Sequence, residues 1–421
     1  MEIFSILITS LIVIFGTINI IRMVLFLVGS DIYMLHQVLE KKRSLNKEEP
    51  FWPTFSVILP AHNEETTIER SIHSVLLSDY PKNKLQVIVM DDGSQDRTLE
   101  IAKEYETFGY NFVAHTQTNK GKAHALNNAM RNYATGELIM CLDSDSFLHP
   151  DALKNAARHF MDPKVKALSS NVKIRSNGTL LNLIQIFEYL ICYQMKRAQT
   201  VFNIEYIIGG IGSVFRQSTL EEVGYYDTDT ITEDIDLTMK ILKRGNKENR
   251  VVYGSDVIAY TESVLDISGL IRQRFRWKYG RAQTFVKNLS LFFNRDKKHT
   301  KLFTWVYLPY AIFSDIAFFF EPVIIGYITY VIVRYADWLT LISAFAVVSA
   351  YIALTILSEV TISRKDRVKY ALMAPSMYFF FYLLSFVEYV ALIKTYIQIH
   401  KIPKSIGNGE CGWVHVARGK I

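Results

Sequence analysis

The stretch "ELIMCLDSDS", residues 137–146, ends an apolar run with two carboxylates, Asp143 and Asp145. A short, continuous apolar run is typical of a strand that is buried on both faces. Successive strand residues point to opposite faces, so residues two apart share a face. Two carboxylates on one face repel each other unless a cation lies between them, and oxygen ligands suit Mg²⁺ or Mn²⁺. We therefore predict a metal site at the end of a strand.

Two other apolar runs, "FSVILPA" at 55–61 and "LQVIVMDDGS" at 85–94, also precede helical patterns. Buried strands that alternate with helices indicate an α/β fold with a parallel sheet, in which ligands bind at the carboxyl ends of the strands. Asp91 and Asp92 lie at one such end. Either acidic cluster alone is explained equally well as a turn with a helix cap. Together, at the ends of neighbouring strands, the two clusters favour a site for a nucleotide and a metal.

The composition indicates a membrane protein. Half of the 421 residues are apolar, and they are concentrated at the N-terminus and after about residue 300. The net charge is +6, and in a membrane protein such an excess usually reflects Lys and Arg in the cytoplasmic loops. Nucleic-acid binding is not expected, because no long basic run is present. Cys141, Cys192 and Cys411 are far apart, so neither a disulfide framework nor a zinc site is expected.

An apolar stretch near the N-terminus has one interior charge, Arg22, and is long enough to cross a bilayer. The acidic start "ME" does not resemble a signal peptide, so we expect an uncleaved membrane helix within residues 1–32. The basic segment "KKRSLNK" at 41–47 places the following residues in the cytoplasm.

More apolar residues fill the region 301–395, which we expect to hold about three membrane helices. The blocks are 302–333, 338–358 and 370–393. The first contains Asp315 and Glu321, and acids inside a span usually face protein or a wet cavity. Four crossings would place the tail, residues 396–421, outside the cell, although its basic residues favour the cytoplasm. Either one block is interfacial or re-entrant, or the tail breaks the charge rule.

Further charged residues lie between and after the two acidic clusters. Lys122 follows Gly121 at the start of a helical pattern, where an ammonium suits a phosphate, although an isolated lysine is more often solvated. In "ITEDIDLTMKILKRG", residues 231–245, Glu233 and Asp234 open an amphipathic helix. Acids in a first helical turn complement the helix dipole. Alternatively, one of them is a general base that activates a sugar hydroxyl.

The segment "RQRFRWKYGR" lies within residues 263–300, which we expect to form amphipathic interfacial helices. Such a basic, aromatic helix suits a surface of anionic lipid. However, Gln273, Arg276 and Trp277 have the spacing of one helical face. Glutamine can bond hydroxyls, arginine can pair with a pyrophosphate, and tryptophan can stack on a sugar ring.

The motifs "DDGS", "NKGKAHALN", "DSD", "TED" and "QRFRW" occur in this order. The set resembles the processive family 2 glycosyltransferases, which include cellulose, chitin and hyaluronan synthases. The short layout, with "GYYDTDTITEDI" before the acidic helix, looks most like the bacterial poly-β-1,6-N-acetylglucosamine synthases. The resemblance implies a GT-A type nucleotide-sugar-binding domain over residues 50–262, flanked by transmembrane helices. One departure is mild, because the residue between the two acids is Ser144.

The resemblance also implies roles for the matching residues. The nucleotide-sugar would contact Asp91, Asp92, Lys122, Asp143 and Arg276. The metal, Mg²⁺ or Mn²⁺, would be bound by Asp145 with Asp143. Asp234 would be the catalytic base with Glu233 beside it, and Gln273 and Trp277 would hold the acceptor.

The expected function is therefore that of a processive, inverting hexosyltransferase in the plasma membrane, with a cytoplasmic catalytic domain. It would polymerise a β-linked polysaccharide of a biofilm or capsule from a UDP-sugar such as UDP-N-acetylglucosamine and help to translocate it. The expected partners are the growing polysaccharide, the lipid bilayer and a small membrane accessory subunit. Three alternatives stay open: a synthase of a hyaluronan-like polymer or capsular glucan, an enzyme that adds one sugar to a lipid carrier, and an inactive channel subunit.

Overall fold

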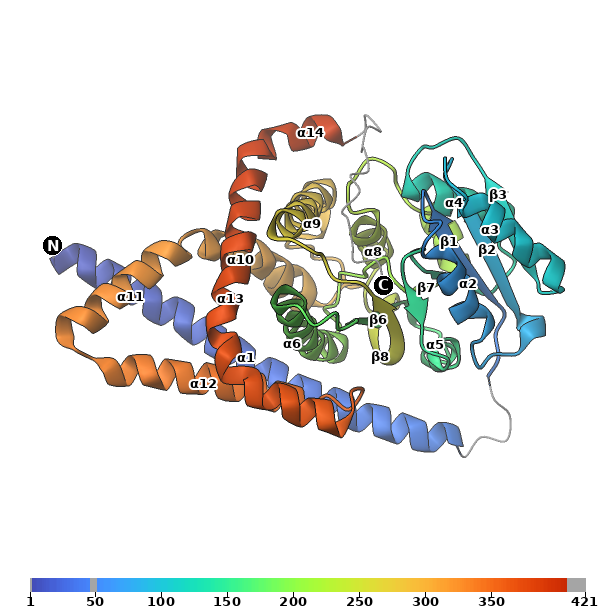
Figure 1. Cartoon of the computed structure of the whole chain (residues 1–421). Coiled ribbons are helices and arrows are strands. Elements are labelled where there is room, and N and C mark those ends of the chain that lie inside the picture. The colour runs from blue at the N-terminus through green and yellow to red at the C-terminus, as the bar shows by residue number, and fades with distance from the viewer. Residues whose placement is uncertain (1, 46–50, 407–421) are drawn as a thin grey trace.

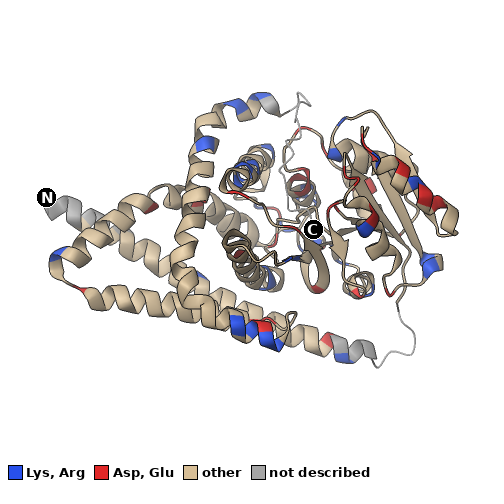
Figure 2. Cartoon of the chain, in the orientation of Figure 1, with Lys and Arg blue, Asp and Glu red and all other residues tan. Residues whose placement is uncertain are grey.

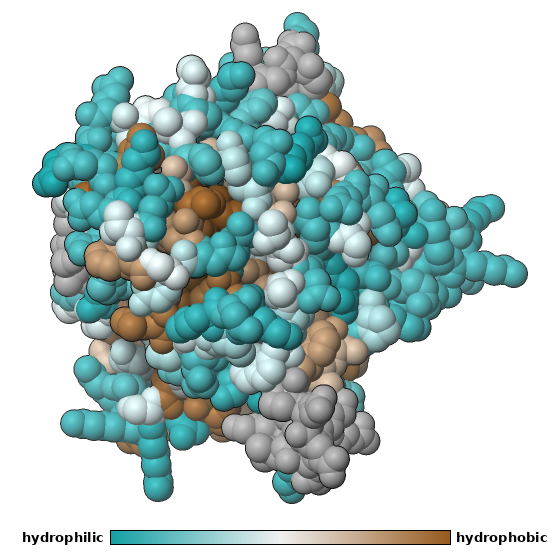
Figure 3. All heavy atoms as spheres, turned by 90° about the vertical axis from the view of Figure 1, so that its right-hand side faces the viewer, coloured by the Kyte–Doolittle hydropathy of each residue, from teal (hydrophilic) through white to brown (hydrophobic). Residues whose placement is uncertain are grey.

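The computed structural model describes residues 2–45 and 51–406, and the elements are labelled in Figure 1. Lys47, Cys411 and the end of the basic tail lie outside the described residues. The chain forms an α/β layer structure on one side and a group of long apolar helices on the other (Figure 1). The face of the α/β part that points away from those helices is mostly hydrophilic, with apolar residues visible in patches (Figure 3).

One mixed sheet of eight strands lies at the centre, in the order β3-β2-β1-β4-β7-β6-β8-β5. The strands are β1 (Phe55–Ala61), β2 (Leu85–Asp91), β3 (Phe112–Thr116), β4 (Leu138–Cys141), β5 (Phe147–Leu148), β6 (Val165–Ile174), β7 (Ser213–Arg216) and β8 (Arg250–Thr261). Strands β3, β2, β1 and β4 are mutually parallel, as are β6 and β8. The prediction of a parallel-rich sheet is therefore confirmed, although β7 runs antiparallel to both β4 and β6.

The two acidic clusters lie at the same edge of this sheet, but not on adjacent strands. Strand β1 pairs with β2 on one side and with β4 on the other. The prediction that the clusters follow neighbouring strands was wrong in this detail, because sequence order does not fix spatial order in a parallel sheet. Because β1 lies between β2 and β4, the two acidic clusters are about 5 Å further apart than they would be on adjacent strands.

Helices cover both faces of the sheet. They are α2 (Ile68–Leu76), α3 (Thr98–Glu104), α4 (Lys122–Asn132), α5 (Ala152–His159), α7 (Gln217–Val223) and α8 (Glu233–Lys243). Alternate residues of β1 explain this arrangement, because Val57 packs in a core with α2 and α5, whereas Ile58 packs in a second core with α4 and α8. Because both faces of the strand are buried, its sequence is a continuous apolar run.

The remaining long helices are α1 (Glu2–Leu45), α6 (Leu180–Phe202), α9 (Ile267–Lys287), α10 (Leu308–Phe319), α11 (Glu321–Tyr335), α12 (Trp338–Leu357), α13 (Arg364–Gln398) and the short α14 (Ile402–Ser405). A π-helix, Leu302–Tyr307, precedes α10, and short 3₁₀ turns lie at Lys82–Lys84, Tyr105–Phe108, Leu289–Leu291 and Ile399–Lys401. Four helical segments are long and apolar enough to cross a membrane: Ile12–Glu40, Leu302–Phe319, Trp338–Leu357 and Arg364–Lys404.

The apolar segments differ in detail from the predicted blocks. Helix α1 continues well beyond the predicted span, and its second half packs along α6. The block 302–333 is broken after Phe319, and Pro322 lies in the first turn of α11. Proline tolerates this position because its missing N–H would be unpaired there anyway. Helices α11 and α12 carry almost no charge, whereas basic residues gather at the start of α13 (Figure 2).

Helix α13 changes direction along its length. Its first half packs against α12, and its second half crosses α9 (Figure 1). The ring of Phe345 in α12 lies 5.3 Å from that of Tyr378, and the ring of Phe319 at the end of α10 lies 5.9 Å from that of Tyr396. Pro375 lies inside the helix between its two halves. An internal proline removes a helical hydrogen bond and bends a helix.

Candidate active site

The acidic pair of "DSD" lies just beyond a strand end. Strand β4 ends at Cys141, so Asp143 and Asp145 belong to the turn that follows it. The argument that strand alternation places both carboxylates on one face was therefore wrong, because the alternation stops two residues before Asp143. Both side chains are half-buried, and Ser146 Oγ donates to Asp145 Oδ1 at 2.9 Å.

Lys122 joins this turn to the acidic helix. Its ammonium donates to Asp143 Oδ1 at 2.5 Å and lies 3.8 Å from Glu233 Oε1. Burial alone would lower the pKa of Lys122, but the carboxylates of Asp143 and Glu233 raise it above the usual value. The lysine is therefore a fixed cation at the start of α4, and the solvated alternative does not apply.

Gly210 lies close to the same charged side chains. A Cβ atom at this position would lie 2.7 Å from Lys122 Nζ, 3.7 Å from Asp143 Oδ1 and 3.9 Å from Asp234 Oδ2. One point on the backbone thus lies close to side chains from three motifs that are far apart in sequence. The sequence analysis missed Gly210, although the stretch "GGIG" at 209–212 suggests a close approach to the backbone.

Asp234 lies in the first turn of α8, where the backbone N–H of Ile235 donates to its Oδ1 at 2.8 Å. Burial, and after it the negative charge of Glu233, raise the pKa of this carboxyl from 3.8 to about 7. The ammonium of Lys122 and the guanidinium of Arg276 oppose this rise. A carboxyl group with a pKa near neutrality is suited to accept and release a proton.

Helix α9 carries the "QRFRW" motif and packs closely on the segment before α8. A Cβ atom on Gly280 would lie 2.4 Å from Thr232 Oγ1, so only glycine allows this approach. The backbone N–H of Ile231 donates to Gln283 Oε1 at 3.0 Å. Gln273 is buried, and Trp277 is half-buried one turn further along the helix. These contacts fix the acidic helix relative to the motif.

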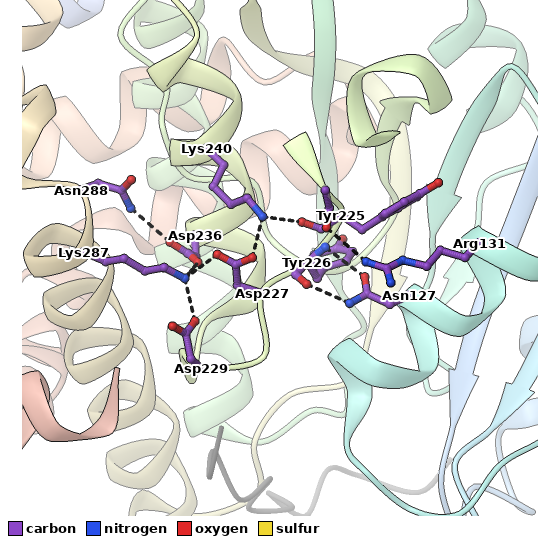
Figure 4. A network of polar contacts seen from close by, with 11 residues as sticks. Asn127, Arg131, Tyr225, Tyr226, Asp227, Asp229, Asp236, Lys240, Lys287 and Asn288 are labelled. Atoms are coloured by element: carbon purple, nitrogen blue, oxygen red, sulfur yellow. Dashed lines mark hydrogen bonds and ion pairs between the residues drawn. The ribbon is translucent and has the colours of Figure 1, made fainter. Parts of the chain in front are cut away.

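Lys287, the last residue of α9, is surrounded by three carboxylates (Figure 4). Its Nζ donates to Asp227 at 2.5 Å, to Asp229 at 2.6 Å and to Asp236 at 2.7 Å. These carboxylates lie close enough together to hold a metal ion, but the ammonium occupies the position between them. Asn288 Nδ2 also donates to Asp236, at 3.1 Å. The sequence analysis missed this network.

The "DDGS" carboxylates bond within the chain. Asp92 accepts from the backbone N–H groups of Lys120, at 3.0 Å, and Gly121, at 2.7 Å. Asp91 accepts from Thr116 Oγ1 at 2.6 Å. Both side chains are buried. They therefore shape the loop that leads to Lys122, and a direct contact to a nucleoside stays a prediction.

The mixed, mostly parallel sheet with this site at its edge is a GT-A-like glycosyltransferase fold. Over 90% of its length the chain resembles the mannosyltransferase PcManGT from Pyrobaculum calidifontis, solved in complex with GDP-Man and Mn²⁺. The TM-score is 0.53, the sequence identity is 22%, and the match covers 97% of that chain. At this identity the likeness concerns the fold alone.

Comparison of sequences narrows the class. The profile described as Glycosyl transferase family 2 matches residues 56–224. A poly-beta-1,6-N-acetyl-D-glucosamine synthase of Staphylococcus epidermidis is 32% identical over 297 residues, which cover 67% of this chain and 70% of that protein. The chain therefore belongs to glycosyltransferase family 2, as its motifs had indicated. The synthase of the same name from Staphylococcus aureus strain COL is 35% identical over 253 residues, and the match spans only 59% of that protein's length.

Proposed function

We propose that the protein is a membrane-bound, processive, inverting glycosyltransferase that polymerises poly-N-acetylglucosamine from UDP-N-acetylglucosamine. The observation that carries this proposal is the convergence of Lys122, Asp143 and Asp234 around Gly210. A fixed cation for a diphosphate, a carboxylate of the "DSD" turn and a carboxyl with a pKa near neutrality meet at one point. The names of the staphylococcal relatives support the choice of polymer.

Three side chains would perform the transfer. Lys122 and Arg276 hold the diphosphate of the donor, since charge-assisted hydrogen bonds to phosphate are strong. Asp234, as a carboxylate, takes the proton from the acceptor hydroxyl while that oxygen attacks the sugar carbon. The attack comes from the side opposite the diphosphate, so a single displacement inverts the configuration. Positioning of a general base contributes about 100- to 10,000-fold in rate.

A divalent cation fits the "DSD" turn. Asp143 and Asp145 have half-buried carboxylates, and carboxylate oxygens are the ligands that Mg²⁺ and Mn²⁺ prefer. Asp145 is the principal metal ligand in this proposal, because Asp143 already pairs with the ammonium of Lys122, whereas Asp145 accepts from the neutral hydroxyl of Ser146. A bound cation would neutralise the charge that develops on the leaving UDP.

Gln273 and Trp277 would hold the acceptor. They lie on α9, which packs on one side against α8 and on another against α13. The growing chain would therefore pass from the site towards the apolar helices. The lipid bilayer surrounds those helices in this proposal, and a small accessory subunit would bind among them.

We also propose three membrane crossings and a cytoplasmic catalytic domain. Helix α1, the broken pair α10 and α11, and helix α12 would cross the bilayer. Helix α13 would start on the cytoplasmic side and return to it, because its second half crosses α9 and the following α14 also packs on α9. The end of α9 is tied to the α/β part by Lys287, which donates to Asp236 of α8. With three crossings the basic tail lies in the cytoplasm, where basic segments are favoured, whereas four crossings would place it outside the cell.

The test is to incubate membranes that contain the protein with a panel of radiolabelled UDP-sugars. We expect incorporation from UDP-N-acetylglucosamine into a polymer that an N-acetylglucosaminidase specific for β-1,6 linkages degrades. Incorporation from another UDP-sugar alone would contradict the choice of donor. A product with a single added sugar would contradict processivity.

A further inference from the structure

The guanidinium of Arg274 is the centre of a buried charge cluster on α9. The residue is only 1% exposed. Its Nη2 donates to Glu188 Oε2 of α6 at 2.6 Å, and its Nε lies 3.1 Å from Glu388 Oε1 of α13. Helices α6 and α13 thus both contact Arg274. In the sequence, Arg274 lies between Gln273 and Arg276.

The same guanidinium lies against the indole of Trp277. The Cζ atom of Arg274 is 4.1 Å from the centroid of the Trp277 ring. A cation at this distance over an indole face is attracted by the ring quadrupole and restricts the ring to one orientation. The guanidinium covers one face of the indole, and the Trp277 side chain is half-buried.

Stability alone does not explain the cluster. A buried ion cluster is on average no more stabilising than apolar side chains of equal volume, because both charges lose their hydration. A flat arginine held from two sides does provide a fixed orientation, which a lysine or an apolar residue would not provide. The guanidinium lies over the ring of Trp277, so a fixed guanidinium also fixes the orientation of this ring.

We propose that Glu188 and Glu388 are positioning residues for acceptor binding: by holding Arg274 against Trp277, they fix the ring on which the growing chain rests. This inference rests on the proposed function. It makes α13 a determinant of how long the acceptor stays bound, and therefore of product length. Glu388 Oε2 also forms an ion pair with Lys278 Nζ, at 2.9 Å, so the carboxylate is itself held between two cations of α9.

The experiment uses the full chain in membranes or detergent, with UDP-N-acetylglucosamine as donor and a short β-1,6-linked oligomer of N-acetylglucosamine as acceptor. Glu388→Gln should raise the KM for the oligomer and shorten the polymer. Loss of a cation–π contact corresponds to roughly 2- to 30-fold in an equilibrium constant, which sets the expected rise. The KM for the donor should stay within about twofold, because the diphosphate side chains are untouched.

Arg272→Met is the matched control, because it removes an exposed cation of α9 that bonds to Ser268 and leaves both carboxylates of Arg274 in place. Its acceptor KM and product length should match those of the wild type. If Glu388→Gln does not fold, Arg274→Lys replaces it, since lysine keeps the charge but not the flat stacking group. Glu188→Gln should give the same change in acceptor KM as Glu388→Gln.

The outcomes separate this inference from the proposed function. If the wild type makes no polymer from any UDP-sugar, the proposed function fails. If the wild type makes polymer but Glu388→Gln and Arg274→Lys keep its acceptor KM and product length, the positioning role is overturned. Equal changes in donor KM, acceptor KM and melting temperature would show a merely structural role and would also overturn it.

Discussion

Lys122 Nζ lies 2.5 Å from Asp143 Oδ1, and this contact joins the start of α4 to the turn after β4. The two residues come from different motifs, and neither motif alone specifies a site. Because Glu233 lies 3.8 Å from the same ammonium, the contact also reaches the first turn of α8.

Gly210→Ala should weaken donor binding without unfolding the protein. The new Cβ would meet the end of the flexible Lys122 side chain, which can move, so the melting temperature should stay near that of the wild type. The displaced ammonium would lose charge-assisted bonds worth about 1.5–3 kcal/mol, or roughly 10- to 100-fold in donor KM. Gly209→Ala is the control, because its Cβ would meet nothing within 4 Å. Equal donor KM values for both variants would rule out this role for Gly210.

Lys287→Met should destabilise the fold, because it leaves the fully buried Asp236 and two neighbouring carboxylates without their shared cation. Removal of one partner from a buried ion pair costs about 3–5 kcal/mol. Chemical denaturation in detergent measures this loss. Lys164→Met removes the exposed pair with Glu248 and should cost at most about 1 kcal/mol. A Lys287→Met variant as stable as Lys164→Met would contradict the assignment.

Asp145→Asn should abolish transfer while the protein stays folded, because the change removes a metal ligand but little packing. EDTA should inactivate the wild type, and Mg²⁺ or Mn²⁺ should restore it. Asp229→Asn tests the rival acidic cluster and should leave the metal concentration for half-maximal activity unchanged. Full turnover of Asp145→Asn in EDTA would disprove the metal site.

The proposed membrane topology predicts which positions are accessible from outside the cell. In a cysteine-free background, Asp337→Cys in the turn before α12 should react with an impermeant maleimide in intact cells. Lys404→Cys, in α14, should react only after the cells are lysed. Labelling of Lys404→Cys in intact cells would mean that α13 crosses the membrane.

The pKa of Asp234 predicts the pH dependence of transfer. A base must be ionised to accept a proton, and the raised pKa of about 7 keeps this carboxyl protonated in acid. We therefore expect kcat/KM to rise with pH and to reach half its limit near pH 7. Glu233→Gln removes a charge that raises this pKa, so its midpoint should move to lower pH. An unchanged or higher midpoint would contradict the electrostatic account.

Much of the fold could be predicted because it depends on local patterns. The continuous apolar runs of β1 and β2 reflect burial on both faces, and the period of α8 reflects one buried stripe. The antiparallel β7 is only four residues long, so its sequence "SVFR" carried no usable signal. The break in the block 302–333 was signalled by Glu321 and Pro322, but the sequence analysis treated the block as continuous.

The residues of the candidate site could be predicted only where charged residues lie close together in the sequence and form a motif. Lys122, Asp143 and Asp234 were identified from their motifs, and the structure brings them together. Lys287 and Asp236 are 51 residues apart, so nothing in either segment identifies the other as its partner. The same holds for Arg274, whose partners lie on α6 and α13. Long-range pairing of charges depends on the packing of whole helices, which local patterns do not encode.

The most direct test of the central claim compares the wild type with Asp234→Asn for binding and turnover of labelled UDP-N-acetylglucosamine. Asparagine keeps the size and most of the capping ability of aspartate but cannot take a proton. If Asp234 is the base, Asp234→Asn should bind the donor almost normally, keep its melting temperature and turn over at least about 100-fold more slowly. Glu233→Gln should lose much less. Near-normal turnover of Asp234→Asn would contradict the account, and with loss of turnover in Glu233→Gln it would move the base by one residue.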